Sequence, residues 1–330
     1  MIFFSTHLVL LICLFGFHLG GLWNWSAVGI LFVLFPIIEI MTAKIEYRPR
    51  SENIRLSEIA LHTLSGLLLL TLIYGFIKFN QAQITSDLVG IAASTGVLLG
   101  AFGITSAHEL IHRRSKLSRT FGVFNLLLIN FGHWGIEHVF GHHKHVATLR
   151  DPATARRNEI IYLFWLREYF SSVVSAFRIS PGKVTAYAGL AALLSVLLYF
   201  GLGKSFLFFW WGVSAVSVLL LQTVDYIEHY GLLRQQREDG SYAAFAVEHA
   251  WDTSSVLTNV VLFNLGLHSH HHLKAQIPFE SLEIKPQSFK MPVGYSFMVV
   301  LALFPMFFIP LMNARLDRYT SLSNKITGSV

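Results

Sequence analysis

Nine of the 16 histidines in the chain lie in four short segments at a spacing that suits metal binding. His108 and His112 are four residues apart, as are His138 and His142, and such pairs lie on one face of a helix, where they can grip one ion. In HSHHH, positions i, i+3 and i+4 also share a helical face. The candidate ligands are His108, His112, His138, His142, His143, His229, His268, His271 and His272.

Carboxylates stand beside these histidines, at Glu109, Glu137 and Glu228. Carboxylates orient metal-bound imidazoles and tune their basicity, so this pairing favours a metal site over a surface rich in histidine. Nine imidazoles exceed what one tetrahedral zinc ion can use, but they suit two ions with four or five ligands each. Imidazole binds zinc, copper, nickel and iron alike, so the residues alone leave the metal open.

The composition predicts a membrane protein that holds these segments together. Of its 330 residues 53% are hydrophobic and 13% are charged, which is unlike a soluble domain. Six apolar runs are long enough to cross a bilayer as helices, so we expect an all-α integral membrane protein. The expected spans are 3–21, 22–42, 58–79, 87–107, 184–201 and 205–224, with shorter half-buried or interfacial helices near 120–136 and 293–311.

Lys and Arg are distributed so as to orient these spans. Residues 43–57 hold four (Lys44, Arg48, Arg50, Arg55), 108–183 hold eleven and the chain from 225 onward holds eight, whereas 80–86 hold none and 202–204 hold one. Because basic loops stay in the cytoplasm, we expect both termini and all four histidine segments on the cytoplasmic side of a bacterial inner membrane. We expect the first apolar run, which lacks a basic leader, to remain as an anchor.

Cofactors other than metal ions are not indicated. Cys13 is the only cysteine, so a cysteine-ligated iron–sulfur cluster cannot form within the chain. We find no glycine-rich nucleotide fingerprint and no internal repeat, and we expect residues 1–330 to form one domain without a nucleic-acid partner. His7, His133, His145, His249 and His270 are expected at supporting or surface positions.

Two other interpretations of the same residues remain. HELIH at 108–112 also matches H-E-x-x-H, which supplies two zinc ligands and a glutamate base to a metalloprotease. That interpretation leaves seven clustered histidines unused. A metal transporter should carry ionisable groups near the middle of the membrane, whereas here they gather at the ends of the spans.

Over residues 100–310 the chain resembles the integral-membrane alkane 1-monooxygenase family, relatives of the membrane fatty-acid desaturases and the xylene monooxygenase hydroxylase. The resemblance lies in HELIHR, EHVFGHHKHVAT with DPAT, DYIEHYGLL, LFNLGLHSHHH and MPVGY. Desaturases generally show H-x-x-H-H in the second box, whereas this chain has H-x-x-x-H-H, which favours the hydroxylase branch. Gly266, Leu267, His270 and Asp225 depart from the family pattern and put substrate range and redox tuning in doubt.

The resemblance implies that the nine histidines hold two non-haem irons. It implies that O2 and two electrons convert the terminal carbon of a membrane-dissolved n-alkane to a primary alcohol. It also implies a rubredoxin or ferredoxin-type carrier with its NAD(P)H reductase, for which Arg113, Arg114, Lys116 and Arg119 are a candidate docking patch. A desaturase or an alkyl-aromatic hydroxylase remains the alternative, and the length of the substrate stays open.

Overall fold

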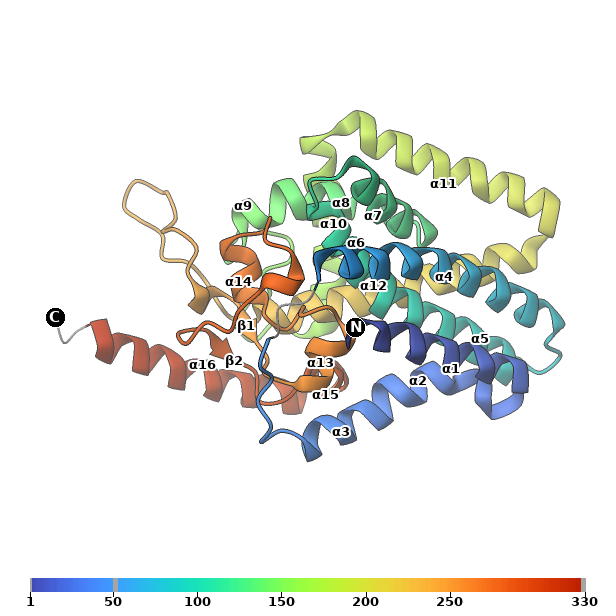
Figure 1. Cartoon of the computed structure of the whole chain (residues 1–330). Helices are drawn as coiled ribbons and strands as arrows, with labels where there is room; N and C mark the ends of the chain where they lie inside the picture. Colours follow the sequence, from blue (N-terminus) through green and yellow to red (C-terminus); the bar gives the residue numbers. More distant parts are fainter. Residues whose placement is uncertain (1, 50–52, 328–330) are drawn as a thin grey trace.

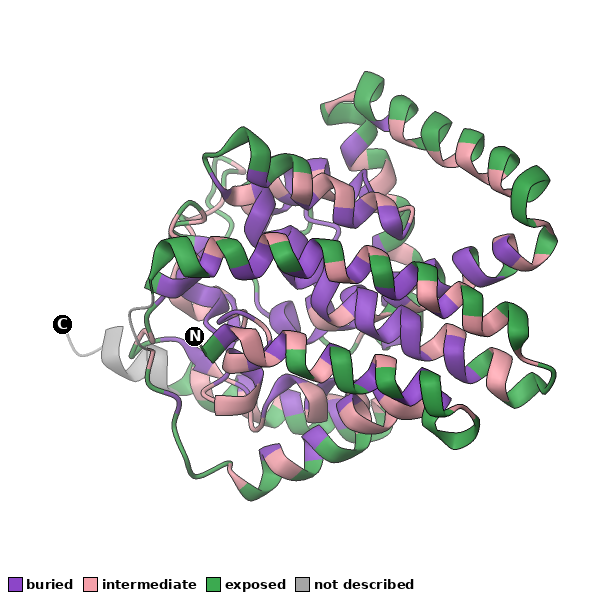
Figure 2. Cartoon of the chain, turned by 45° about the vertical axis from the view of Figure 1, so that its right-hand side comes forward, coloured by how far each residue is buried: buried purple, intermediate pink, exposed green. Residues whose placement is uncertain are grey.

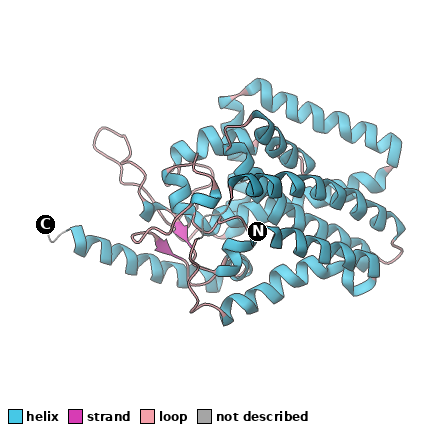
Figure 3. Cartoon of the chain, viewed as in Figure 1, coloured by secondary structure: helices cyan, strands magenta, loops and turns pink. Residues whose placement is uncertain are grey.

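The computed structural model describes residues 2–49 and 53–327, and helices dominate it (Figure 3). The α-helices are α1 (Ser5–Leu19), α2 (Ser26–Gly29), α3 (Phe35–Met41), α4 (Ile54–Gln81), α5 (Thr85–Leu98), α6 (Ile104–His112), α7 (Lys116–Leu128), α8 (Trp134–Glu137), α9 (His143–His145), α10 (Ile161–Ile179), α11 (Pro181–Leu202), α12 (Lys204–His229), α13 (Val256–Val261), α14 (His268–Leu273), α15 (Tyr295–Ala302) and α16 (Pro305–Thr327). Short 3-10 turns cover Ile2–Phe4, Gly21–Trp25, Val247–His249 and Phe279–Ser281. π-helical turns cover Ile30–Leu34, Leu99–Gly103 and His138–His142.

Within the described residues, six helical stretches are long and apolar enough to cross a membrane, as the sequence predicts. They are Ile2–Leu19, Gly21–Met41, Ile54–Gln81, Thr85–His112, Pro181–Leu202 and Lys204–His229. The second and fourth each combine α-helical and π-helical turns. The all-α membrane architecture is therefore confirmed.

The histidine-bearing elements gather at one end of the bundle. In Figure 1, α9 and α14 lie at the end opposite the short connections that join α1 to α2, α4 to α5 and α11 to α12. This matches the predicted alternation of basic and bare connections across the membrane. Arg50, one of the basic residues behind the predicted orientation, lies outside the described residues.

Close packing between α5 and α12 fixes the spans that carry two of the histidine segments. A Cβ at Gly96 would lie 2.6 Å from the Cβ of Val216, and one at Gly100 would lie 3.0 Å from the Cα of Ser217. Ser217 Oγ also donates to the carbonyl oxygen of Gly96 at 2.8 Å. The small residues of the fourth span thus allow two backbones to approach, which is their usual use between membrane helices.

Two expected helices differ from the structure. The run near 120–136 is divided: α7 ends at Leu128, and Asn130 takes a positive φ of 56° before α8 begins. The run near 293–311 is divided between α15 and α16, which starts at Pro305. Each run therefore contains two short helices where we expected one, and the breaks fall at Asn130 and before Pro305, among the polar and proline residues that interrupt these runs.

Elements that the sequence did not predict support the site. α10, which was not expected, packs against α8 and α12. α11, which contains the expected span 184–201, stands at the edge of the bundle with little of its surface covered (Figure 2). Strands β1 (Trp251–Asp252) and β2 (Phe289–Lys290) form one parallel pair, with Trp251 opposite Phe289. This pair holds Asp252 beside the start of α14, where its carboxylate accepts from Ser269 N and Oγ, both at 2.7 Å.

Candidate metal centre

The structure brings all nine predicted histidines into two neighbouring groups. Within each group, one ring nitrogen from every member lies within 4.8 Å of the others. The five-histidine group consists of His108, His112, His138, His143 and His271. The four-histidine group consists of His142, His229, His268 and His272.

Ring nitrogens converge closely inside each group. In the four-histidine group, His268 Nε2 lies 3.0 Å from His229 Nε2 and 2.9 Å from His272 Nε2, which is 3.2 Å from His142 Nε2. In the five-histidine group, His143 Nε2 lies 3.1 Å from the Nε2 atoms of both His138 and His271. Nitrogens that each lie about 2.1 Å from one ion at right angles are about 3 Å apart, so these spacings fit imidazoles that share an ion.

Burial keeps these imidazoles in the form that binds metal. Burial lowers the pKa of His138, His143, His268, His271 and His272 well below the ordinary value of 6.5, and the neighbouring histidines lower it further. A neutral imidazole offers a lone pair to a cation. Several buried ring nitrogens have no hydrogen-bond partner among the described residues, including His108 Nε2 and His112 Nε2. The donor set therefore fits bound metal ions.

A π-helical turn divides the second histidine segment between the groups. We expected His138 and His142 to share one ion, but residues His138–His142 form a π turn, with i to i+5 hydrogen bonding. The wider turn pairs His138 with His143, five residues on, and directs His142 to the other group. That expectation was therefore wrong, whereas His108 and His112 do share a group as predicted.

Helix α14 serves both groups from one face. His268 and His272, four residues apart, enter the four-histidine group, whereas His271 enters the five-histidine group. The predicted common face is present, but it lies between two sites. Asp252 fixes the first turn of this six-residue helix through Ser269, so the orientation of three candidate ligands depends on one buried carboxylate.

Asp151 is a supporting residue that the sequence analysis missed. Its carboxylate accepts from His142 Nδ1 at 3.0 Å and from Thr154 Oγ1 at 2.6 Å. Burial alone would raise the pKa of Asp151, but the ring of His142 and the hydroxyl of Thr154 hold it below its ordinary value. The DPAT segment after the second histidine box was the available signal.

The three predicted carboxylates differ in their contacts. Glu228 Oε2 lies 3.4 Å from His268 Nε2, and its other oxygen accepts from Tyr295 Oη at 2.7 Å. Glu109 Oε1 lies 3.7 Å from His108 Nδ1, which is beyond hydrogen-bonding distance. Glu137 instead accepts from Ser175 Oγ at 3.2 Å. Of the three, only Glu228 therefore lies within 3.4 Å of a histidine in the group beside it, and it does so at the Nε2 that faces the other ligands.

Glu109 is also placed where a metalloprotease base could not act. Its Oε2 accepts from the backbone N–H of Phe279 at 3.2 Å, and the side chain is buried. A protease base has to face a metal-bound water and an open substrate cleft. The H-E-x-x-H interpretation therefore finds no support in the geometry of this segment.

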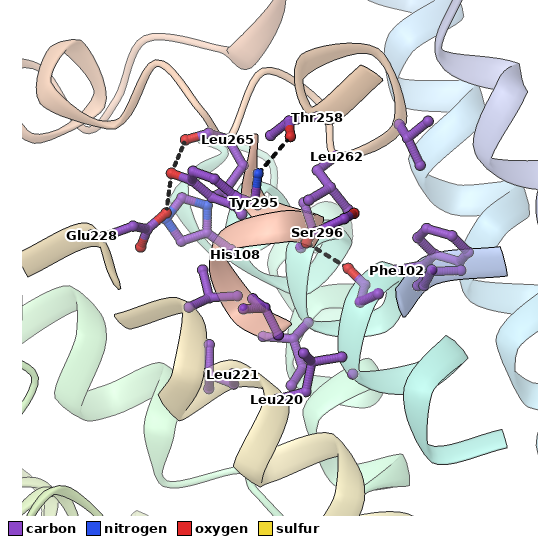
Figure 4. Close-up of a pocket in the computed structure, with 18 of the residues that line it drawn as sticks. Phe102, His108, Leu220, Leu221, Glu228, Thr258, Leu262, Leu265, Tyr295 and Ser296 are labelled. Carbon is purple, nitrogen blue, oxygen red and sulfur yellow. Dashed lines mark hydrogen bonds between the residues drawn. The ribbon is translucent and has the colours of Figure 1, made fainter. Parts of the chain in front are cut away.

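An apolar cavity leads to both groups. His108 and His138 of one group and His268 of the other line it, together with Glu228 and Tyr295 (Figure 4). Its remaining walls come from three of the spans and from α13 and α15. They include Leu31, Phe32, Phe35, Phe102, Leu220, Leu221, Val224, Leu257, Val261 and Val299. A cavity with this apolar lining suits a hydrophobic molecule.

Tyr295, from the MPVGY segment, closes one wall of the cavity. Its hydroxyl donates to Glu228 at 2.7 Å and lies 3.3 Å from the carbonyl oxygen of Leu265, and its backbone N–H donates to Thr258 Oγ1 at 2.9 Å (Figure 4). These contacts join α15 to α12 and α13. The cavity wall at Tyr295 and the carboxylate of Glu228 beside His268 are therefore joined by a hydrogen bond.

The remaining histidines lie outside both groups, as expected. His270 is buried, but its Nδ1 accepts from the backbone N–H of Glu283 at 2.9 Å. His249 Nδ1 accepts from Ala246 N, and His133 Nε2 lies 3.4 Å from Ser172 Oγ. His7 Nε2 lies 3.0 Å from Thr63 Oγ1.

The predicted docking patch is only partly a surface. Arg113 is buried, and its guanidinium forms a bidentate ion pair with Glu280 at 2.8 and 3.1 Å. Arg119 donates to the carbonyl oxygens of Arg113 and Arg114. Arg113 therefore cannot meet a partner protein, and its assignment to the patch was wrong.

Comparison with known proteins agrees with this arrangement. Residues 88–284 match the family model for fatty acid desaturase. Alkane 1-monooxygenase 1 and alkane 1-monooxygenase 2 of Pseudomonas aeruginosa are 33% and 30% identical to the chain, each over 90% of its length and over 84% and 85% of their own. The xylene/toluene monooxygenase hydroxylase component XylM of Pseudomonas putida is 23% identical over 84% of the chain and 79% of its own length. The chain therefore belongs to the alkane 1-monooxygenases of the fatty acid desaturase family, and it is a multi-pass membrane monooxygenase.

Proposed function

We propose that the chain is a non-haem di-iron hydroxylase that converts the terminal carbon of an n-alkane to a primary alcohol. The observation that carries this proposal is the convergence of nine imidazoles in two groups at the end of one apolar cavity. One iron would be held by His108, His112, His138, His143 and His271, and the other by His142, His229, His268 and His272. Iron is preferred over zinc because zinc has no redox chemistry.

The bound irons would supply the reductive activation of O2. Overall, one C–H bond, O2, two electrons and two protons give one alcohol and one water. The protein's own residues orient the metal ligands and exclude water from the cavity. Asp151 holds the Nδ1 side of His142 so that its Nε2 faces the other ligands, and Asp252 fixes α14. The cavity walls keep water from the reacting carbon.

The lining of the cavity supports a hydrocarbon substrate. Its walls are mainly aliphatic and aromatic, and His108, His138 and His268 line it, so an alkyl chain would lie among the spans with one end toward the metal groups. The two Pseudomonas aeruginosa relatives are named alkane 1-monooxygenases, which favours an alkane. An alkyl-aromatic substrate is the second candidate because XylM is named as a xylene/toluene enzyme and also resembles this chain.

Electrons would have to come from another protein, because the chain has one cysteine and no nucleotide fingerprint. We propose a rubredoxin or ferredoxin-type carrier with its NAD(P)H reductase. We also propose that residues 1–330 act as one domain in a bacterial inner membrane, with the metal groups on the cytoplasmic side.

Metal analysis and product analysis test this proposal together. Purified protein should contain close to two irons per chain, and with carrier, reductase and NAD(P)H it should convert octane or dodecane to the primary alcohol. Xylene and a fatty acyl lipid are supplied in parallel, and product formed from either one would indicate an alkyl-aromatic or an acyl-lipid substrate. Stoichiometric zinc with full activity would overturn the di-iron assignment, and product formed with NAD(P)H alone would overturn the need for a carrier.

A further inference from the structure

Helix α10 presents apolar side chains outward. Leu163, Leu166, Phe170, Val174 and Phe177 are 48 to 65% exposed, and their spacing of three or four residues places them in one stripe. The opposite face of the helix buries Glu168 and Ser172. An exposed apolar stripe on a helix whose buried face also holds polar side chains suits a helix that meets lipid on its outer side.

A groove adjoins the part of this stripe that Phe170 and Val174 form. Phe140 and Leu149 also line it. Phe140 is 60% exposed and Leu149 is 63% exposed, so both side chains present apolar surface. The groove is therefore shaped to receive alkyl chains beside the protein.

Four cations surround the same groove. Lys144, Arg150, Arg156 and Arg178 all line it and are exposed, and none of them forms an ion pair within the part of the chain that the structure describes. A fifth cation, Arg167, is already paired with Glu159 at 2.7 Å.

Little negative charge balances them. Among the residues that line the groove, the only carboxylate is that of Asp151, and it is buried against His142. The groove thus combines unbalanced positive charge with apolar walls.

We propose that this groove binds one anionic phospholipid, with the phosphate held by the cations and the acyl chains lying along the stripe of α10. A soluble acidic carrier would match the charge, but it would leave the apolar stripe, Phe140 and Leu149 in water. A lipid satisfies both features at once. The site is distinct from the cavity at the histidines, and the proposal does not depend on the identity of the oxidised substrate.

Lipid binding by the full-length protein in detergent tests the proposal. Native mass spectrometry should show one tightly held phosphatidylglycerol, with phosphatidylcholine held more weakly. The double variant Arg156→Gln/Arg178→Gln should bind phosphatidylglycerol roughly thirtyfold more weakly, because each cation near an anionic lipid surface contributes about a factor of five. Arg178→Gln alone should give part of this loss, which keeps the test valid if the double variant folds poorly.

The matched control is Arg114→Gln/Lys116→Gln, which removes two exposed cations outside the groove. It should bind phosphatidylglycerol as the wild type does. Equal binding of the two lipids, or unchanged binding in the groove variants, would overturn the proposal. Groove variants that keep the lipid but lose affinity for an acidic carrier would assign the groove to the carrier instead. Iron content, measured separately, reports on the metal centre and not on this site.

Discussion

Asp151 accepts a hydrogen bond from His142 Nδ1 at 3.0 Å, and both side chains are almost completely buried. The contact fixes the ring so that Nε2 faces His272 at 3.2 Å in the four-histidine group. Thr154 Oγ1 donates to the same carboxylate at 2.6 Å, and Ala153 N donates to it at 3.2 Å. The carboxylate therefore belongs to the metal centre although it is no candidate ligand.

Asp151→Asn should weaken metal binding while the fold persists. The amide keeps the size of the side chain but loses its charge, and loss of such a supporting partner costs about 10- to 100-fold in metal affinity. Iron retention against a graded chelator measures the effect. Asp317→Asn, which removes an exposed partner of Arg157, is the control and should retain iron normally. Equal retention by both variants would contradict the role of Asp151.

The division into two groups predicts which ion each histidine variant loses. His142→Ala should release the ion of the four-histidine group, and His271→Ala that of the five-histidine group, so each variant should hold about one iron in place of two. Activity should be lost in both. Mössbauer spectra of the two variants should differ because different ions remain. His270→Ala is the control, since His270 lies outside both groups; identical spectra for the first two variants would argue against the division.

Acid should destabilise the metal-free protein. Burial lowers the pKa of His133 to about 4 and that of His249 to about 4, from an ordinary 6.5. Above pH 6.5 these histidines are neutral in both the folded and the unfolded protein. Below pH 6.5 the unfolded chain binds protons at these histidines, whereas the folded chain does not. Stability is therefore lost as pH falls from about 6.5 toward 4. The Tm of the metal-free protein should drop between pH 7.5 and 5.5, and a constant Tm would contradict this account.

Arg113 should matter for folding and not for docking. Arg113→Met leaves Glu280 buried without its partner, and breaking a buried ion pair of this kind costs about 3–5 kcal/mol. Thermal unfolding should show the loss. Lys116→Glu, at an exposed cation nearby, should leave Tm unchanged and raise the KM for an acidic carrier. An unchanged Tm for Arg113→Met, together with a raised KM for the carrier, would show instead that Arg113 belongs to the docking surface.

The proposed orientation predicts the result of reporter fusions. Reporters after residues 150 and 240 should read as cytoplasmic, because these segments lie near the histidines and adjoin basic stretches. Reporters at 83 and 203, in the short connections at the opposite end of the bundle, should read as external. A cytoplasmic result at either short connection would break the six-span arrangement.

Apolar length and histidine spacing were enough to predict the framework. A span needs about 20 apolar residues whatever its neighbours, so the six crossings could be located from the sequence alone. The nine histidines could be selected because they fall in boxes beside carboxylates. Their convergence in space follows from boxes at the ends of spans that share one side of the membrane, as at His112 and His229.

Only the tertiary structure decided how the histidines divide. His138 and His142 have the same four-residue spacing as His108 and His112, yet a π turn separates the first pair, and nothing in the local sequence specifies that extra residue in the turn. Asp151 and Glu280 likewise gained their roles from partners brought to them by folding. Spacing along a chain fixes which side chains share a helical face, but a buried polar group takes whichever partner the packing of separate helices places within reach.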